Sequence, residues 1–445
     1  MKTIQTVITD HLDIWTAAET EKKSGRGRSS GNAGSVYGIK KLRELILELA
    51  VRGKLVPQDA NEEPATELLK RIQAGTIKKI KLQLEMNDQK KPFKLPKGWE
   101  WVNFGSVSEI ERGGSPRPIK SFFTNDADGL NWIKIGDTDQ GGKYITSTNE
   151  KIRKEGLSKT RMVYPGDFLL TNSMSFGRPY ITKIEGCIHD GWLRITPPEA
   201  LDKDFLYYLL SSSYVRKVFI AAAAGAVVMN LNADKVRDVL IPVPPLAEQY
   251  RIVAKVDELM ALCDQLETRH CNAAVAHEKL VSHLLGTLTQ SQSAEDLSVN
   301  WQRIAAHFDT LFTTEASIDA LKQTLLQLAV MGKLVPQDAN DEPASELLKR
   351  IQAEKAQLIA EGKIKKDKPL APITDAEKPF DLPKGWEWGR LGELAHLITK
   401  GSSPKWQGVS YTNNPDDVMF VTSENVGSYT LLLDSPKYVE KNLTI

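Results

Sequence analysis

The stretch LAVRGKLVPQDANEEPATELLKRIQA at residues 49–74 returns at residues 328–353 as LAVMGKLVPQDANDEPASELLKRIQA. The two copies differ only at Arg52/Met331, Glu62/Asp341 and Thr66/Ser345. A repeat of such long period indicates two structural units of one kind, and it has to be identified before any short motif is interpreted. The sequence therefore predicts one frame that occurs twice.

Further matching segments flank the repeat. Residues 91–101 read KPFKLPKGWEW and residues 378–388 read KPFDLPKGWEW. Beyond these segments the two copies share few identical residues. Upstream, ITDHLD at residues 8–13 is similar to IAAHFD at residues 304–309. Because the segments between the copied parts are unlike each other, we expect a conserved frame that carries two different inserts.

Length, charge and cysteine content set broad limits. A chain of 445 residues with 41% hydrophobic residues can form two to four domains. The 58 Lys and Arg residues balance 57 Asp and Glu residues, so any surface for a polyanion must be local. Cys187, Cys263 and Cys271 are too few for a disulfide framework, which indicates a reducing compartment. No apolar run has membrane-spanning length and no signal-peptide core is seen, so we expect a cytoplasmic protein.

The N-terminal part predicts two helices and two polar segments. Residues 39–52 have helical periodicity and end before Gly53, and a second short helix begins after Pro64. The Gly/Ser-rich segment 22–38 predicts a flexible linker. Residues 76–97 contain seven lysines, which indicate either a solvated charge run or contacts to phosphates.

Short extended segments dominate the first insert, from Trp101 to about Val243. Residues 204–210 predict one helix between them. This mixture is typical of a compact α+β domain. The predicted strands are residues 131–135, 167–171, 180–184 and 192–196.

A long helix is predicted after the Pro-rich run 242–246. Apolar, small or histidine residues recur there at alternating spacings of four and three, as in a coiled-coil seam that needs a partner helix. The seam positions are Ile252, Val256, Leu259, Cys263, Leu266, His270, Ala273, His277, Leu280 and Leu284. Cys263, His270, Cys271, His277 and His283 do not make a metal site, since seam residues seven apart lie about 10 Å apart along the axis.

The usual catalytic motifs are absent from the sequence. It contains no phosphate-binding loop, no dinucleotide fingerprint and no Gly-x-Ser-x-Gly elbow. Thr196-Pro-Pro-Glu199 and Val243-Pro-Pro-Leu246 do not fit the Pro-Pro-Tyr/Phe signature of adenine methyltransferases, and Asn413–Asp417 is better explained as a turn than as a nuclease carboxylate pair. We therefore predict no catalytic residue and no metal ligand.

Several motifs, in their order, resemble a known family. The run LIPVPPLAEQ at residues 240–249, followed by Arg251-Ile252 and the long helix, resembles the end of a target recognition domain in specificity subunits of type I restriction-modification enzymes. LPKGWEW at 95–101 is similar to the entry of such a domain, and WIKIGD at 132–137 and PGDFLL at 165–170 are similar to its interior landmarks. The duplicated frame is also the plan of that family.

The resemblance implies a fold and a set of partners. The fold would be α+β, with globular target recognition domains of short strands and a few helices, joined by long conserved coiled-coil helices in a pseudo-two-fold repeat. Each domain would read one half of a bipartite DNA target, while the helices set the spacing. The subunit itself would catalyse nothing and hold no cofactor. It would bind double-stranded DNA, two methyltransferase subunits and restriction/motor subunits, in which S-adenosylmethionine, ATP and Mg²⁺ are expected.

The resemblance also divides the chain into four parts. Residues 1–98 would form an N-terminal conserved arm, 99–245 the first recognition domain, 246–388 a central conserved region whose long helix spans 246–287, and 389–445 the incomplete start of a second recognition domain. The repeat offset of roughly 287 residues predicts a natural chain of about 570 residues or more. We therefore expect this chain to be truncated and its long helix to lack an intramolecular partner.

DNA contacts are expected on loops near the family landmarks. Arg and Lys can bind guanine edges or phosphates, and Asn can bind adenine. The expected contact residues are Arg112, Ser115, Arg117, Lys120, Lys143, Asn172, Ser173 and Arg178. Two other interpretations stay open at this point, namely a catalytic DNA adenine methyltransferase and a coiled-coil scaffold for protein partners.

Overall fold

The computed structural model forms two compact units, Met1–Ala276 and His277–Ile445. It describes residues 10–17, 37–75, 91–139, 141–172, 176–196, 201–223, 231–366, 368–401, 403–404, 408–427, 430–434 and 436–440. Residues 22–36 of the predicted linker and 76–90 of the lysine-rich stretch lie outside the described residues. No described helix has both the length and the apolar character needed to cross a membrane.

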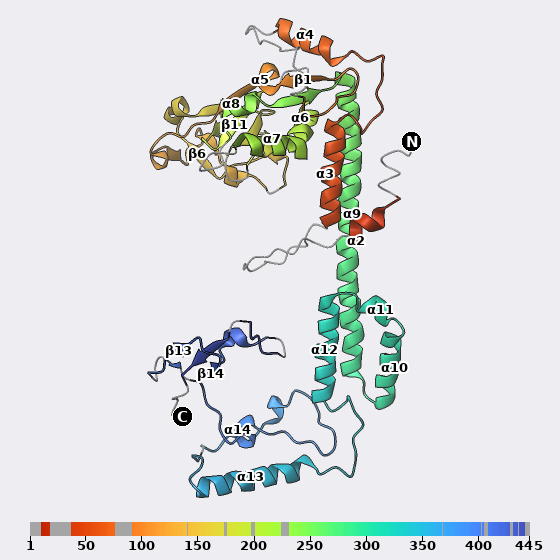
Figure 1. Ribbon diagram of the computed structural model, residues 1–445, viewed down its shortest axis with the longest axis vertical. Helices are drawn as coiled ribbons and strands as arrows, with labels where there is room; N and C mark the ends of the chain where they lie inside the picture. Colours follow the sequence, from red (N-terminus) through yellow and green to blue (C-terminus); the bar gives the residue numbers. More distant parts are fainter. Residues whose placement is uncertain are drawn as a thin grey trace. The chain divides into compact units, whose positions relative to one another are not determined.

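The first copy of the repeat, here called the first frame, comprises residues 37–75 and 91–101. Its helix α3 (Tyr37–Val51) ends before Gly53, whose φ of +63° suits a helix C-terminus, and α4 (Ala65–Gly75) begins after Pro64. Both predicted helices are confirmed. α3 packs along the long helix α9 (Leu246–Gln290), and α2 (Leu12–Ala17) packs against α3 (Figure 1). The expectation that the long helix lacks an intramolecular partner is therefore wrong, because the apolar face of α3 covers it within the same chain.

The insert that follows the first frame is an α+β domain, as predicted. Its first and last strands, β1 (Glu100–Asn103) and β12 (Leu240–Val243), pair antiparallel with Glu100 opposite Val243. This pairing brings both ends of the domain to one place beside the frame. The outer part of the domain, around β6, lies at the end remote from α9 (Figure 1).

Two five-stranded sheets make up this domain, and the four strands predicted between residues 131 and 196 are confirmed. One sheet has the order β2 (Glu109–Arg112), β11 (Trp192–Thr196), β8 (Phe168–Thr171), β9 (Pro179–Thr182) and β5 (Tyr144–Ile145). The other has the order β3 (Phe123–Thr124), β6 (Glu150–Ile152), β4 (Leu130–Ile133), β10 (Gly186–Ile188) and β7 (Arg161–Val163). Neighbours are antiparallel except for the β4–β10 and β5–β9 pairs.

The domain has more helices than the sequence predicted. The predicted helix at 204–210 is α6 (Lys203–Ser211), but α5 (Phe104–Val107), α7 (Ser213–Ala223) and α8 (Ala233–Arg237) were missed. Short 3-10 turns add η2 (Ile119–Ser121), η3 (Ile135–Asp137) and η4 (Lys154–Lys159). α7 was missed because its aromatic and β-branched residues favour a strand locally, whereas burial of Val215 and Phe219 in the core stabilises the helix.

The prediction of one continuous seam along α9 was wrong in its second half. Ile252, Val256, Leu259, Cys263 and Leu266 are buried in the core that contains α3, as predicted. His270, Ala273 and Leu280 are exposed, and the buried residues further on are Val281, Leu285 and Leu288. A straight helix has 3.6 residues per turn, so a strict seven-residue pattern drifts by about 20° per heptad and cannot face one side over such a length.

The second unit contains the second copy of the repeat, here called the second frame and comprising residues 316–353 and 378–388. The helices of this unit are α10 (Ala294–Ala305), α11 (Phe308–Leu311), α12 (Glu315–Val330), α13 (Ala344–Ala360) and α14 (Leu391–Leu394), with 3-10 turns η5 (Asp375–Glu377) and η7 (Ser423–Asn425). A three-stranded antiparallel sheet has the order β13 (Tyr411–Thr412), β15 (Lys437–Val439) and β14 (Val418–Phe420).

Candidate nucleic-acid interface

A tight turn, His189–Trp192, joins the two five-stranded sheets of the α+β domain and is here called the Asp190 turn. It connects β10 in one sheet to β11 in the other, and the Trp192 amide donates to the His189 carbonyl over 3.1 Å. Trp192 is fully buried, its indole N–H donates to the Ile133 carbonyl over 3.2 Å, and its ring packs edge-on against Tyr180. The turn is therefore held firmly to both sheets.

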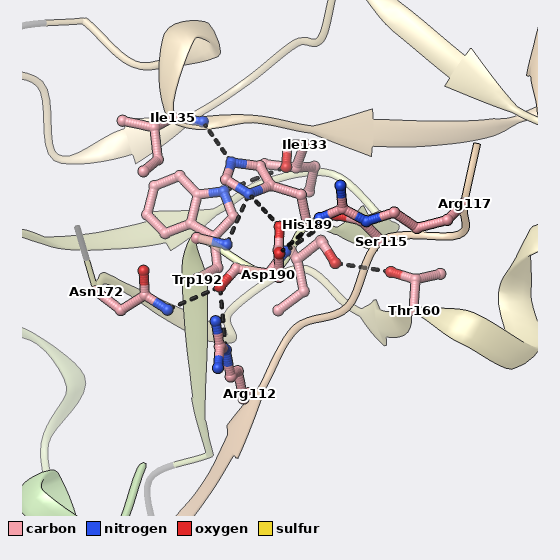
Figure 2. A network of polar contacts seen from close by, with 12 residues as sticks. Arg112, Ser115, Arg117, Ile133, Ile135, Thr160, Asn172, His189, Asp190 and Trp192 are labelled. Carbon is pink, nitrogen blue, oxygen red and sulfur yellow. Dashed lines mark hydrogen bonds and ion pairs between the residues drawn. The ribbon is translucent and has the colours of Figure 1, made fainter. Parts of the chain in front are cut away.

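Four of the eight predicted contact residues converge on Asp190 (Figure 2). Asn172 Nδ2 and Arg112 Nε donate to the Asp190 carbonyl oxygen over 2.8 and 3.2 Å. The Ser115 hydroxyl donates to the Asp190 carboxylate over 2.9 Å, and the Arg117 guanidinium lies 3.5 Å from it. Partial burial acts to raise the pKa of Asp190, but the Ser115 hydrogen bond and the nearby positive charge outweigh burial and lower that pKa.

The remaining predicted residues are spread over other places. Lys120 lies on η2, in the same loop as Arg117, and is exposed. Lys143 lies beside α6, where it pairs with Asp204 over 2.5 Å and lies 4.9 Å from the Tyr207 ring centroid. Arg178 also acts electrostatically on Tyr207, so it belongs to the same region. Ser173 lies outside the described residues.

A hollow of about 470 Å³ opens beside the Asp190 turn. Phe123 and Trp132 contribute apolar surface, while Arg117, Lys134 and Asp190 contribute charge. Lys134 pairs with Glu150 over 2.9 Å at the lining of the hollow. The site therefore presents hydrogen-bond donors and acceptors around an apolar floor, as suits a partner with a polar edge.

His189 is a site residue that the predicted contact set missed. The Gly191 amide points at its Nδ1 over 2.7 Å, and the Ile135 amide points at its Nε2 over 3.2 Å. A neutral imidazole can accept at one nitrogen only, and a protonated one at neither. Burial lowers the pKa of His189, although Asp190 opposes the shift, so the structure favours the neutral ring.

The pH dependence of the Asp190 turn follows from the lowered pKa of His189. An unfolded histidine has a pKa of about 6.5, so below that pH the unfolded chain takes up a proton that the folded ring resists. The contribution of the neutral His189 ring to the stability of the folded state is therefore complete above about pH 6.5, and it is lost as the pH falls toward the lowered pKa of His189 in the folded protein. We expect hydrogen-exchange protection of β10 and β11 to fall between pH 7.5 and 5.5.

A matched pair of variants isolates the histidine. His189→Gln keeps an acceptor but does not titrate, so part of the pH dependence of protection should disappear, whereas His283→Gln, at an exposed position of α9, should leave it unchanged. Equal pH dependence in wild type and His189→Gln would show that the His189 ring does not control the turn.

Three exposed cations, Lys120, Arg153 and Lys159, lie on the loop that contains Arg117 and on the segment 153–161 that packs against it. Residues 153–161 pack against residues 112–122, where the Arg153 amide donates to the Phe122 carbonyl over 2.8 Å. A Cβ atom on Gly114 would lie 2.4 Å from the Lys159 carbonyl oxygen, so the two segments are in close contact. No described carboxylate lies within ion-pair distance of Lys120, Arg153 or Lys159, here called the cation strip.

The sequence contained a signal for the cation strip that the loop-based prediction did not use. The segment 151–161, KIRKEGLSKTR, has five Lys or Arg residues among eleven and a single acidic residue. Lys154 pairs with Asp128 and Arg161 with Glu111, both over 2.9 Å. Of the three remaining cations, Lys151 donates to the Ala127 carbonyl, and Arg153 and Lys159 belong to the cation strip. A dense basic segment inside a neutral chain is typical of a local polyanion-binding surface.

The chain is similar to known proteins of one class. The family model described as type I restriction modification DNA specificity domain matches residues 96–276. The chain is 46% identical over 420 residues to the EcoEI specificity subunit and 45% identical over 431 residues to the EcoAI specificity subunit, both type I restriction enzyme subunits from Escherichia coli. These matches cover 90% and 89% of this chain and 69% of each relative.

The solved structures are more distant. The HsdS subunit from Thermoanaerobacter tengcongensis matches with 20% identity and a TM-score of 0.33, over 58% of this chain and 62% of that chain. The E. coli relatives decide the assignment: the chain belongs to the family of type I restriction enzyme specificity subunits. It is thus a DNA sequence-specificity subunit, and the catalytic methyltransferase and the scaffold find no support in these comparisons.

Proposed function

We propose that residues 99–245 read one half of a bipartite DNA target, with the Asp190 turn and the cation strip facing the duplex. The observation that carries this proposal is the convergence of four polar residues on one rigid turn beside three locally uncompensated cations. Contacts to phosphates supply most of the affinity, whereas contacts to base edges supply the sequence preference. The surface offers both kinds of group.

The contacts divide these residues into positioning and reading groups. Asn172 is almost fully buried and its amide N–H is already bonded to the Asp190 carbonyl, so it positions the turn. Arg117 is 80% exposed and Asp190 engages one side of it, so its remaining N–H groups can bind a guanine edge. The cation strip contacts phosphates, and such contacts do not depend on the DNA sequence.

The assembly we propose follows the family. Two methyltransferase subunits dock on the two frames, whose duplication supports two equivalent sites, and restriction/motor subunits join that core. The long helix sets the distance between the two half-sites. S-adenosylmethionine, ATP and Mg²⁺ belong to the partner subunits, and the complex acts in the cytoplasm.

Substitution of Arg117 tests base reading. In the complex with its methyltransferase subunits, Arg117→Ala should reduce discrimination at one target base pair by about 1–3 kcal/mol. Arg117→Lys keeps the charge but loses the planar fork, so it should lose the discrimination and keep most of the affinity. Competition binding with single-mismatch duplexes measures both quantities. If Arg117→Ala weakened binding to matched and mismatched duplexes equally, Arg117 would be a phosphate contact.

A further inference from the structure

The first turn of α9 contains two buried polar side chains, Glu248 and Gln249, which are 1% and 0% exposed. The two carboxylate oxygens of Glu248 accept separate hydrogen bonds. The Trp99 indole N–H donates over 2.8 Å and the Gln58 amide over 2.6 Å. Because Trp99 lies at the entry of the recognition domain and Gln58 belongs to the first frame, Glu248 connects both of them to α9.

Gln249 binds two further parts of the recognition domain. Its side-chain oxygen accepts from the Asp202 amide over 2.8 Å, and its side-chain amide donates to the Pro244 carbonyl over 3.1 Å. The Asp202 side chain caps α6, and Pro244 directly follows the last strand, β12. The domain is therefore attached to α9 at its entry, at its exit and at α6. The four hydrogen bonds of Glu248 and Gln249 are here called the α9 joint.

The α9 joint resists rotation of the domain on the helix. A buried polar group that loses its partner costs about 1–3 kcal/mol. Because two adjacent side chains make all four hydrogen bonds, a rotation that breaks one of them strains the others. A fully paired buried network of this kind specifies one arrangement, whereas apolar packing is non-directional.

The distance between the α9 joint and the Asp190 turn makes the angle important. Trp132 of β4 and Glu150 of β6 line the hollow beside the turn, and the region around β6 lies at the end of the domain remote from α9 (Figure 1). For a domain of this size, that distance is on the order of 30 Å. A rotation of about 6–7° at the joint would then move the turn by about 3.4 Å, the rise of one base pair.

We propose that Glu248 and Gln249 are positioning residues that fix the number of base pairs accepted between the two half-sites. The length of α9 sets how far apart the half-sites lie, but it leaves the angle of the recognition domain on the helix free. The α9 joint fixes that angle, and with it the place where the Asp190 turn meets the duplex. This inference rests on the proposed reading of one half-site by residues 99–245.

Gln249→Leu in the complete complex with its methyltransferase subunits tests the proposal, because leucine has a similar size but makes neither hydrogen bond. Competition binding compares duplexes whose half-sites are separated by the native spacer or by one base pair more or fewer. The methylation pattern of the wild type defines the half-sites and the spacer. We expect the preference for the native spacer to fall by about tenfold. Discrimination against a single mismatch, measured at the native spacer, should stay as in the wild type.

Matched variants separate the hydrogen bonds from the packing. Glu248→Leu should lower the spacer preference as Gln249→Leu does, whereas Glu248→Gln keeps an acceptor for the Trp99 indole and should retain most of it. Glu258→Leu removes an exposed carboxylate further along α9 and should leave the preference unchanged. Trp99→Phe keeps an aromatic ring and removes the indole donor, so it is the milder variant where a leucine variant does not assemble, with an expected loss of about threefold.

An unchanged spacer preference in Gln249→Leu, or in Trp99→Phe where the leucine variants do not assemble, would overturn the proposal. Equal losses of spacer preference and of mismatch discrimination would overturn it too, because they would show that the α9 joint only stabilises the fold. A failure of the proposed function gives a different result, in which Arg117→Ala leaves mismatch discrimination at the native spacer unchanged.

Discussion

Replacing Lys120, Arg153 and Lys159 together by glutamate is expected to lower the affinity for duplex DNA by about a hundredfold or more. These cations are exposed and have no described carboxylate partner, so no nearby carboxylate neutralises their positive charge. The substitution places three negative charges where phosphates are expected. Each lost phosphate contact reduces the salt dependence of the binding constant by about 0.9 in the log–log slope. The slope should therefore fall by about three.

A matched triple variant controls for net charge. Lys203, Arg216 and Lys217 are exposed on α6 and α7 of the same domain, and their replacement by glutamate changes the net charge equally. This control should cost far less affinity at 0.15 M salt, where exposed charges farther apart than about 8 Å are screened. Titrations of the methyltransferase complex at several salt concentrations measure affinity and slope together. Equal losses in both triple variants would mean that the cation strip is not the phosphate-binding surface.

Trp192→Ala is expected to lower the free energy of unfolding of the recognition domain by about 3–5 kcal/mol. Trp192 is fully buried, packs against Tyr180 and donates to the Ile133 carbonyl, so truncation leaves a cavity and an unsatisfied buried acceptor. The Asp190 turn loses its anchor at the same time. Trp192→Phe retains the ring packing in part and should cost less.

Pulse proteolysis in increasing urea measures this effect without requiring that the whole chain unfold in one step. Trp301→Ala, at a partly exposed position of α10, should change stability by less than about 1 kcal/mol and serves as the reference. A cost below about 1 kcal/mol for Trp192→Ala would mean that the two sheets are not held together through this residue.

Local patterns in the sequence were sufficient to predict the frame and most strands. The helix that ends before Gly53, the helix after Pro64 and the strand at 192–196 follow from periodicity and turn chemistry, which act over a few residues. The second half of the α9 seam was mispredicted because burial there depends on which elements pack against the helix. That information does not lie in the helix sequence alone.

The candidate site could be predicted only in part for a similar reason. Arg112, Ser115, Arg117 and Asn172 were selected as loop residues, although Arg112 is the last residue of strand β2. Their common partner, Asp190, is more than 70 residues from Ser115 along the chain. Asn172 was predicted to contact DNA. Because its side chain is buried and its amide N–H is already hydrogen-bonded to the Asp190 carbonyl, we assign it the role of positioning the turn. Arg153 and Lys159 stand in a basic segment that the prediction did not use. The contact of that segment with residues 112–122 could not be predicted, because it arises from sheet topology, which no single segment encodes.

The most direct test of base reading by the Asp190 turn is the methylation pattern of genomic DNA modified by the complete complex carrying Arg117→Ala. Single-molecule sequencing gives the consensus of the modified sites. We expect one half of the bipartite consensus to become relaxed at a single position, while the other half and the spacer length stay as in the wild type. An unchanged consensus, or an equal change in both halves, would contradict the assignment of this surface to one half-site.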